Sequence, residues 1–355
     1  MREFAESDIS PVASKLDSDA RVPGDLLAKL PTLGLYGITT PAELGGVGAD
    51  FLSFVLAVEE ISRVSASISS LIAFHNSVVC EALLASTNSE LKNSLLPKLA
   101  TGESKSSFTF DPKSTISCTI EGGGIILNGS SDYVLGASFA DVFLVLARMK
   151  DSAPVIAGFS KSEAGASLQV GEERMLMGLR GTGTAKISLS KLKLPIGSLV
   201  FDPQKTSSAL ENLNARSRLA VAAQALGIAQ ASLDEEVRYA GERTQFNSKI
   251  GKFYAVQDFI AMDEISIETA RSVTYNVASK ISTLPTLQRD SSIAKVAASN
   301  AAVQSARHSI RVHGGYGFIR DYPVERYLRD ARATQLYMES NESLKAKIAE
   351  SLLSL

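Results

Sequence analysis

The spacing of apolar residues changes twice along the chain, and this limits the fold more than any other feature of the sequence. In the first hundred residues apolar side chains recur at steps of three and four, as on one face of a helix. In the next hundred they alternate with polar residues, as in half-buried strands, and after that the helical spacing returns over long stretches. The pattern predicts an N-terminal helical domain (1–104), a middle antiparallel β domain (105–205) and a C-terminal four-helix bundle (206–355).

The N-terminal part carries its clearest helical stripe between Asp50 and Ala85. The apolar residues of this stripe are Phe51, Phe54, Val55, Val58, Ile61, Ile68 and Ile72. Asp50 precedes the first of them and has a side chain suited to an N-cap. We therefore expect helices that begin at Asp50 and bury this stripe.

The middle part contains Asn128-Gly129 between two apolar runs, 124–127 and 133–135. Asparagine and glycine tolerate the positive φ angles of a type I′ turn. The sequence therefore predicts a β-hairpin whose turn lies at Asn128-Gly129.

Composition narrows the class of protein. The chain has 355 residues and a formal net charge of −2, so it lacks the field of one sign that attracts nucleic acid or an anionic membrane. No apolar run reaches the roughly 18 residues needed to span a bilayer. Cys80, Cys118 and the three histidines have no metal-ligand spacing, so we expect no metal site. Because the first residues do not resemble a signal peptide, we expect a cytoplasmic enzyme or enzyme-like protein.

Five segments carry motifs that occur together in one known family. They are the segments 41–46 (PAELGG), 96–103 (LPKLATGE), 178–184 (GLRGTGT), 241–246 (GERTQF) and 313–332 (HGGYGFIRDYPVERYLRDAR). In this order they resemble the acyl-CoA dehydrogenase family over essentially the whole chain. The last segment is the most specific, since it matches the family's H-G-G-x-G and Y-P-V-E-R-x-x-R-D-A-R motifs.

The resemblance implies a function as well as the three-part fold. Members of the family oxidise an acyl-CoA thioester to the α,β-enoyl thioester: a carboxylate removes the α proton while the β hydride passes to FAD. The family usually forms dimers or tetramers in which the flavin pocket spans two subunits. An acyl-CoA substrate, FAD, a homo-oligomer or a related subunit, and an electron-transfer flavoprotein are therefore the expected ligands and partners.

The catalytic base is the position where the sequence departs most from the family. The family's Y-E-G-T segment reads Tyr337-Met338-Glu339-Ser340 here, so a methionine stands where the glutamate base is expected. Glu339, one residue later, is the candidate base if it lies on a loop, because on a helix it would point about 100° away. The alternative interpretation of Glu339 is a solvated acid.

A second location for the base also matches poorly. Some family members carry it on the first bundle helix, just before an arginine, and the matching pair here is Ser217-Arg218. Serine is not a competent base without a partner, whereas Arg218 matches an arginine near the family's active site. The resemblance makes Arg218 and Tyr337 candidate substrate-binding residues, although Arg218 could equally be a buried salt-bridge partner.

The expected flavin contacts are partly retained. Arg243 and Phe246 match residues that contact the pyrophosphate and adenine from a neighbouring subunit, and Gly314 and Gly315 match glycines where the backbone approaches the cofactor. Arg311 replaces a family glutamine at the same site.

The segment that backs the flavin ring in the family, W-I-T-N, reads Tyr133-Val134-Leu135-Gly136. Tyr133 could still stack on the ring, but Leu135 cannot donate a hydrogen bond. The family's T-E-P-x-x-G-S-D segment corresponds to residues 110–117, which retain only the proline and an acid.

These losses leave alternatives open. The chain could be a flavin-dependent acyl-CoA dehydrogenase-like oxidoreductase with an unusual base. It could instead be a catalytically degenerate subunit of a heteromeric acyl-CoA dehydrogenase, with a structural or cofactor-supporting role, or an acyl-CoA-binding module. Outside these motifs, we interpret His75 as a hydrogen-bonded core or interface residue, Met175 and Met177 as core-filling residues, and Asp263 and Glu264 as solvated acids.

Overall fold

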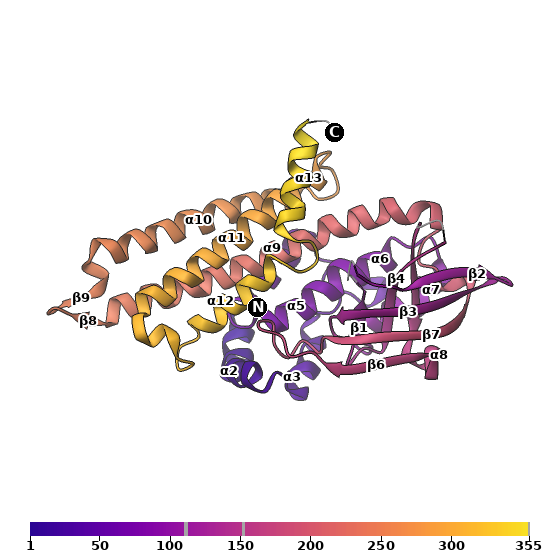
Figure 1. Ribbon diagram of the computed structural model, residues 1–355, viewed down its shortest axis with the longest axis horizontal. Coiled ribbons are helices and arrows are strands. Elements are labelled where there is room, and N and C mark those ends of the chain that lie inside the picture. Colours follow the sequence, from indigo (N-terminus) through magenta and orange to yellow (C-terminus); the bar gives the residue numbers. More distant parts are fainter. Residues whose placement is uncertain (110–112, 151–152, 354–355) are drawn as a thin grey trace.

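The computed structural model describes residues 1–109, 113–150 and 153–353. N-terminal helices, a central β-sheet and long C-terminal helices follow one another, which confirms the predicted fold class (Figure 1). The N-terminal helices are α1 (Arg2–Phe4), α2 (Ser10–Asp19), α3 (Gly24–Lys29), α4 (Phe51–Ser62), α5 (Ala66–Phe74), α6 (Glu81–Leu84) and α7 (Ser89–Ala100).

The predicted stripe lies in the protein core. Asp50 caps α4 by accepting a hydrogen bond from the Ser53 backbone N–H at 2.7 Å, as expected. All seven stripe residues are buried, and α4 and α5 pack against Leu219 and Leu226 of the C-terminal helices. The N-terminal helices and the bundle therefore share one hydrophobic core.

One helical segment, Ala66–Leu84, is by length and composition apolar enough to cross a bilayer, in contrast to the expectation from the sequence that no apolar run is long enough. It comprises α5, a wider turn at His75–Cys80 and α6. Because 94% of its most apolar window is buried inside the protein, it has the environment of a core helix.

The central sheet is mixed rather than purely antiparallel. Its strands are β1 (Ser106–Phe108), β2 (Ser117–Glu121), β3 (Gly124–Val134), β4 (Val142–Arg148), β5 (Pro154–Ser160), β6 (Leu168–Glu173) and β7 (Ala185–Pro195). The order is β1-β4-β2-β3-β7-β6, and β5 pairs with β4. Most pairs are antiparallel, but β1 runs parallel to β4, and β2 meets β4 in parallel at one position. A short helix, α8 (Lys161–Ala164), follows β5.

The hairpin prediction at Asn128-Gly129 is wrong. The tight turn lies six residues earlier, at Gly122-Gly123, where both residues have positive φ (61° and 79°) and join β2 to β3. Strand β3 continues through Asn128-Gly129, and its register against β7 shifts there, as in a β-bulge. Asn-Gly suits either feature, so the local sequence could not distinguish the two.

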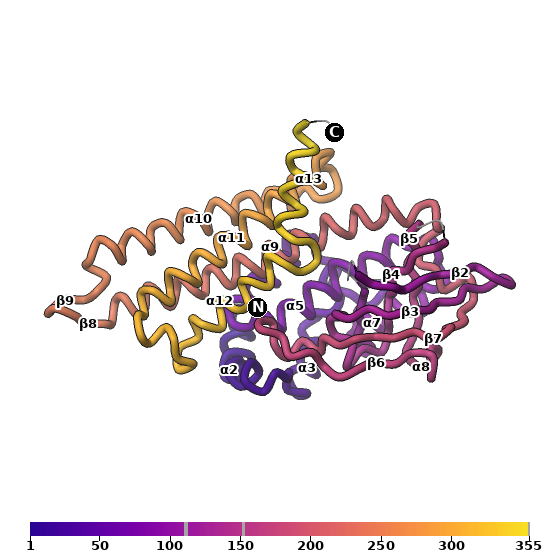
Figure 2. The backbone as a smooth tube through the Cα atoms, viewed as in Figure 1, coloured from indigo at the N-terminus to yellow at the C-terminus, as the bar shows by residue number. Residues whose placement is uncertain are grey.

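The C-terminal helices are α9 (Pro203–Glu242), α10 (Tyr254–Ser279), α11 (Leu287–His313), α12 (Val324–Thr334) and α13 (Asn341–Leu353). A two-stranded ribbon, β8 (Thr244–Gln245) and β9 (Ser248–Lys249), connects α9 to α10. The tube in Figure 2 shows α9 carrying the chain from the sheet to the opposite end of the molecule, where the ribbon lies.

Candidate active site

A largely apolar cavity of about 1010 Å³ lies where the sheet meets the start of α9 and the connection from α12 to α13. Its apolar lining includes Phe74, Phe108, Leu135, Leu146, Leu210 and Leu336. Such a cavity can enclose an apolar group and exclude water from it. Tyr133, Tyr337 and Glu339 also line it, so the fold brings these candidate residues together.

Glu339 lies on the turn between α12 and α13, not on a helix. Its carboxylate accepts hydrogen bonds from Arg218 at 2.6 and 2.8 Å, and from Lys347. Burial raises the pKa of this carboxyl, but Lys347 and Arg218 outweigh that effect and hold the pKa below its usual range. Glu339 is therefore an ionised, partly buried carboxylate, and the solvated-acid interpretation is wrong.

Arg218 lies on α9 and is only 3% exposed. Besides Glu339, its guanidinium donates to the Gln288 side chain at 2.9 Å and to the Gln288 carbonyl at 3.2 Å. These bonds confirm the salt-bridge interpretation, and they connect Arg218 to the pocket through Glu339.

Tyr337 forms part of the pocket wall, with its hydroxyl turned away into a buried polar cluster. The hydroxyl donates to the Gln224 side-chain oxygen, and the Gln224 amide donates to Ser70 at 2.6 Å and to the Ala66 carbonyl at 2.7 Å. Burial raises the pKa of Tyr337, so the hydroxyl keeps its proton. The ring is thus fixed in place from behind.

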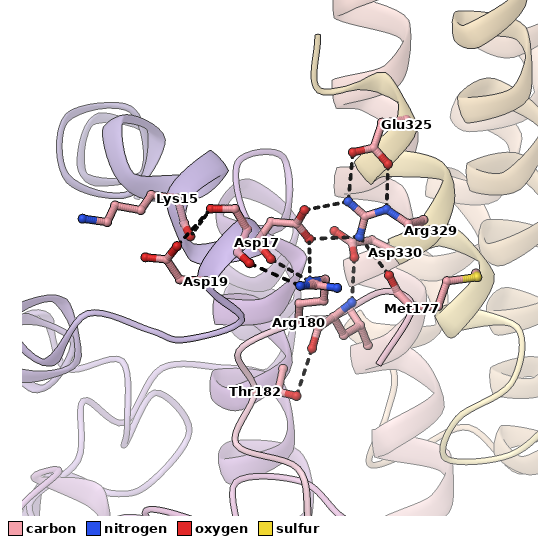
Figure 3. Close-up of polar contacts among 11 residues, drawn as sticks. Lys15, Asp17, Asp19, Met177, Arg180, Thr182, Glu325, Arg329 and Asp330 are labelled. Atoms are coloured by element: carbon pink, nitrogen blue, oxygen red, sulfur yellow. Dashed lines mark hydrogen bonds and ion pairs between the residues drawn. The ribbon is translucent and has the colours of Figure 1, made fainter. Parts of the chain in front are cut away.

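Two of the family-like segments meet beside the pocket (Figure 3). Asp330 accepts a hydrogen bond from the Leu179 backbone N–H at 2.7 Å, and Arg329 donates to the Met177 carbonyl at 2.8 Å. Arg329 also pairs with Asp17 of α2 at 2.6 Å, and Arg180 donates to the Asp17 carbonyl. Since 176–179 line the pocket, these contacts hold that wall against α12.

Tyr133 is 61% exposed at the pocket, where the Arg174 guanidinium lies 5.6 Å from its ring centre. Met175 and Met177 are 77% and 60% exposed, so the prediction that they fill the core is wrong. Residues 110–112, which carry the proline and acid of the expected T-E-P segment, lie outside the described residues.

A second cavity, of about 600 Å³, lies at the ribbon end of the molecule. Arg243, Gly314 and Gly315 line it together with Tyr239 and Tyr316. The Arg243 guanidinium stacks 5.5 Å from the Tyr316 ring centre, and no carboxylate of the described residues pairs with it. A Cβ placed on either glycine would meet nothing within 4 Å, so their backbone borders open space.

The remaining two candidates also lie near this end. Phe246, next to the ribbon, is 89% exposed, has a positive φ of 51° and contacts only the edge of Phe253 among described aromatic rings. Arg311 of α11 stacks on Phe259 of α10 with 4.7 Å between guanidinium and ring centre. The structure therefore divides the predicted site residues into two separate groups, one around the pocket between the sheet and the α12–α13 connection and one at the ribbon end of the molecule (Figure 1).

His75 fits the structural interpretation. Its Nδ1 accepts a hydrogen bond from the Ser106 hydroxyl at 2.7 Å, because its Nε2 must donate to the Leu99 carbonyl at 3.1 Å. Burial lowers the pKa of His75 to about 4, so the ring stays neutral. Its prediction as a hydrogen-bonded core residue is confirmed.

Three further residues contact Glu339 or Tyr337 and were not expected from the sequence: Lys347, Lys295 and Gln224. No motif marks these residues. In the sequence, Lys347 looks like an ordinary surface lysine of a helix. Only the tertiary fold brings it to Glu339.

The comparisons with known proteins agree with this geometry. Residues 1–103 match the acyl-CoA dehydrogenase N-terminal domain, and residues 206–353 match the acyl-CoA dehydrogenase C-terminal domain. An acyl-CoA dehydrogenase of Bacillus subtilis is 33% identical over 99% of this chain and 96% of its own. The caffeyl-CoA reductase-Etf complex subunit CarC of Acetobacterium woodii is 30% identical over 99% of this chain and 96% of its own.

Solved structures show the same relationship. The butyryl-CoA dehydrogenase of Megasphaera elsdenii superimposes with a TM-score of 0.95 at 26% identity, covering 99% of this chain and 96% of its own. Fold and sequence together define a flavin-dependent oxidoreductase. The chain belongs to the acyl-CoA dehydrogenase family, whose members bind FAD, act on acyl-CoA thioesters and are typically homo-oligomers.

The residues present fit FAD in two separate portions. At the ribbon end, the cavity offers the Arg243 guanidinium, which has no carboxylate partner among the described residues, together with exposed glycine backbone and aromatic rings. These groups suit a pyrophosphate and an adenine. Where the sheet meets the bundle, the exposed ring of Tyr133 beside the apolar pocket suits the flavin ring.

Proposed function

We propose that the chain oxidises an acyl-CoA thioester to the α,β-enoyl thioester, with Glu339 as the base. The observation that carries this proposal is that Glu339 is the only carboxylate among the described residues that line the 1010 Å³ pocket. Its ionised state is the one that a base requires.

In this reaction the Glu339 carboxylate takes the α proton, and the electron pair of that C–H bond forms the new double bond. Bound FAD would supply the acceptor for the hydride that leaves the β carbon. Arg218 and Lys347 keep the carboxylate charged and oriented, while the apolar lining excludes water from it. The same cations lower its basicity, so Glu339 must be close to the α carbon to be effective.

The two separate groups of cofactor residues support an assembly of at least two chains. In such an assembly, Arg243, Phe246, Gly314 and Gly315 of one subunit complete the flavin pocket of another, with Arg311 nearby. A relative named as a subunit of an Etf complex supports an electron-transfer flavoprotein as the oxidant that regenerates the cofactor.

An absorbance scan of the purified protein, before and after incubation with FAD, tests the proposal. We expect a flavin band that bleaches when acyl-CoA is added without oxygen, and a bleaching rate at least about 100-fold lower in Glu339→Gln. Glu342→Gln is the matched control, because Glu342 is an exposed acid three residues away. Equal rates in wild type and Glu339→Gln would rule out Glu339 as the base.

A second function has its own support. Met338 stands at the family's base position, and the Glu339 carboxylate is already paired with Arg218 and Lys347. Both features are compatible with a subunit that does not catalyse the reaction. This candidate predicts colourless protein that cannot be reconstituted with FAD, and much better yield when a flavin-bearing relative is co-expressed. In that complex Arg243→Ala should weaken FAD binding by the relative. Yellow protein that bleaches with acyl-CoA on its own would exclude this function.

A further inference from the structure

Lys295 is a fully buried lysine in the first half of α11. A buried ammonium group loses its hydration, so it is stable only where polar partners replace the water. Burial here lowers the pKa of Lys295 to about 8. Because burying this ammonium group is unfavourable, we expect its contacts to have a structural role.

The partners of Lys295 all belong to the turn that carries the candidate base. Its Nζ donates to the Glu339 carbonyl at 2.7 Å and to the Asn341 side-chain oxygen at 2.9 Å. Asn341 is itself buried and donates to the Ser299 hydroxyl at 3.0 Å and to Asn300 at 3.2 Å. Three side chains of α11 thus hold both ends of the segment from Glu339 to Asn341.

The turn is held in an unfavourable conformation. Met338 has a φ of 65°, in the left-handed region that residues other than glycine rarely adopt because the Cβ atom crowds the backbone. Such a conformation persists only where surrounding contacts impose it. The backbone bond from Asn341 N–H to the Gln335 carbonyl at 2.9 Å closes the turn. Glu339, the residue after Met338, lines the pocket and pairs with the buried Arg218 behind it.

We propose that Lys295 is a positioning residue that fixes the 338–341 turn and thereby directs the Glu339 carboxylate into the pocket. Lys295 touches the Glu339 backbone and not its carboxylate, so it acts through the path of the chain. This inference rests on the proposed function in that it assumes a role for Glu339 in the pocket. The hold on the turn itself does not depend on that role.

Hydrogen exchange of residues 336–342 tests the hold on the turn directly. We expect Lys295→Met to speed exchange there by about tenfold or more, because it removes both side-chain bonds. Ser305→Ala is the matched control, since Ser305 is equally buried on α11, ten residues further on, and its hydroxyl has no partner among the described residues. Unchanged exchange in Lys295→Met would overturn the inference, whatever the activity. If that variant fails to fold, Asn341→Ala takes its place: it removes one of the two Lys295 bonds together with the Asn341 bonds to Ser299 and Asn300, and it is expected to speed exchange of the same residues. Unchanged exchange in Asn341→Ala would likewise overturn the inference.

A double-mutant cycle with Glu339→Gln then separates positioning from general stability. We expect Lys295→Met to slow acyl-CoA-dependent flavin bleaching about tenfold in the wild type and to have no further effect in Glu339→Gln. Equal losses in both backgrounds would contradict action through Glu339. If Glu339→Gln alone changes nothing, the proposed base fails, while the exchange measurement still decides the hold on the turn.

Discussion

Two glutamates of this protein, one partly and one fully buried, have pKa values shifted in opposite directions. Glu339 lies beside the pocket with Arg218 and Lys347, and its pKa is lowered. Glu236 of α9 is fully buried in the bundle beside Asp263 of α10, and its pKa is raised. Burial favours the neutral form in both places, so the neighbours decide the charge.

The site in the bundle holds two acids, Glu236 and Asp263, with few nearby groups that stabilise their negative charge. Burial is the largest cause of the raised pKa of Glu236, and the Asp263 carboxylate adds to it. Of the two acids, only Asp263 has hydrogen bonds to His308 and Gln304, at 2.9 and 3.3 Å. A proton retained on Glu236 relieves the repulsion between the two acids. A carboxylate that acts as a base must instead be ionised. The interpretation of Asp263 as solvated is therefore wrong, whereas Glu264 is exposed.

Removing the buried cation should have the largest effect. We expect Arg218→Met to lower the free energy of unfolding by about 3 kcal/mol, because it leaves the Glu339 carboxylate partly buried without its main partner. Urea denaturation measures this. Arg238→Met, which breaks the exposed ion pairs of Arg238 with Glu235 and Glu242 on the same helix, should cost under about 1 kcal/mol. Similar losses in both variants would remove the distinction between the two sites.

Removing the buried acid should have the opposite effect. We expect Glu236→Gln to raise the free energy of unfolding by about 1 to 2 kcal/mol near pH 8, since an amide needs no proton to stay neutral. The folded carboxyl binds its proton more tightly than the unfolded one, so wild-type stability falls as pH rises above the ordinary pKa of 4.5. The gain should therefore disappear below that pH. Thermal melts across pH test this, with the exposed Glu264→Gln expected to show no such trend.

The smallest effect is expected at the half-exposed cation. Lys347→Met should change the free energy of unfolding by less than about 1 kcal/mol. Because Lys347 lowers the pKa of Glu339, its loss should move the acid limb of the bleaching rate to higher pH. Lys345→Met, on the exposed face of the same helix, should leave that limb in place. A limb that does not move in Lys347→Met would show that Arg218 alone sets the charge of Glu339.

The sequence predicted the fold better than the site. The stripe from Phe51 to Ile72 depends on local periodicity, which burial in the structure follows closely. The Asn128-Gly129 turn failed because two glycine-containing segments compete in one strand pair, and only pairing across the sheet decides between them.

In the site, counting from the R-D-A-R motif located Glu339, and the match to the family located Arg218. Neither the motif nor the family match could predict which residues surround Glu339 and Arg218. Lys295 reaches the turn over 44 positions of sequence, and Lys347 reaches it from the following helix. Contacts of this kind depend on how the helices pack, which no local pattern records.

The distance between the two cavities has a consequence for how such a protein must be handled. If each flavin is held between chains, cofactor retention becomes a matter of mass action, and the concentration of protein sets it as much as any single contact. Dilution would then release FAD together with the dissociation of the subunits. A preparation that is yellow when concentrated and pale when dilute would be responding to its own partners, not to damage.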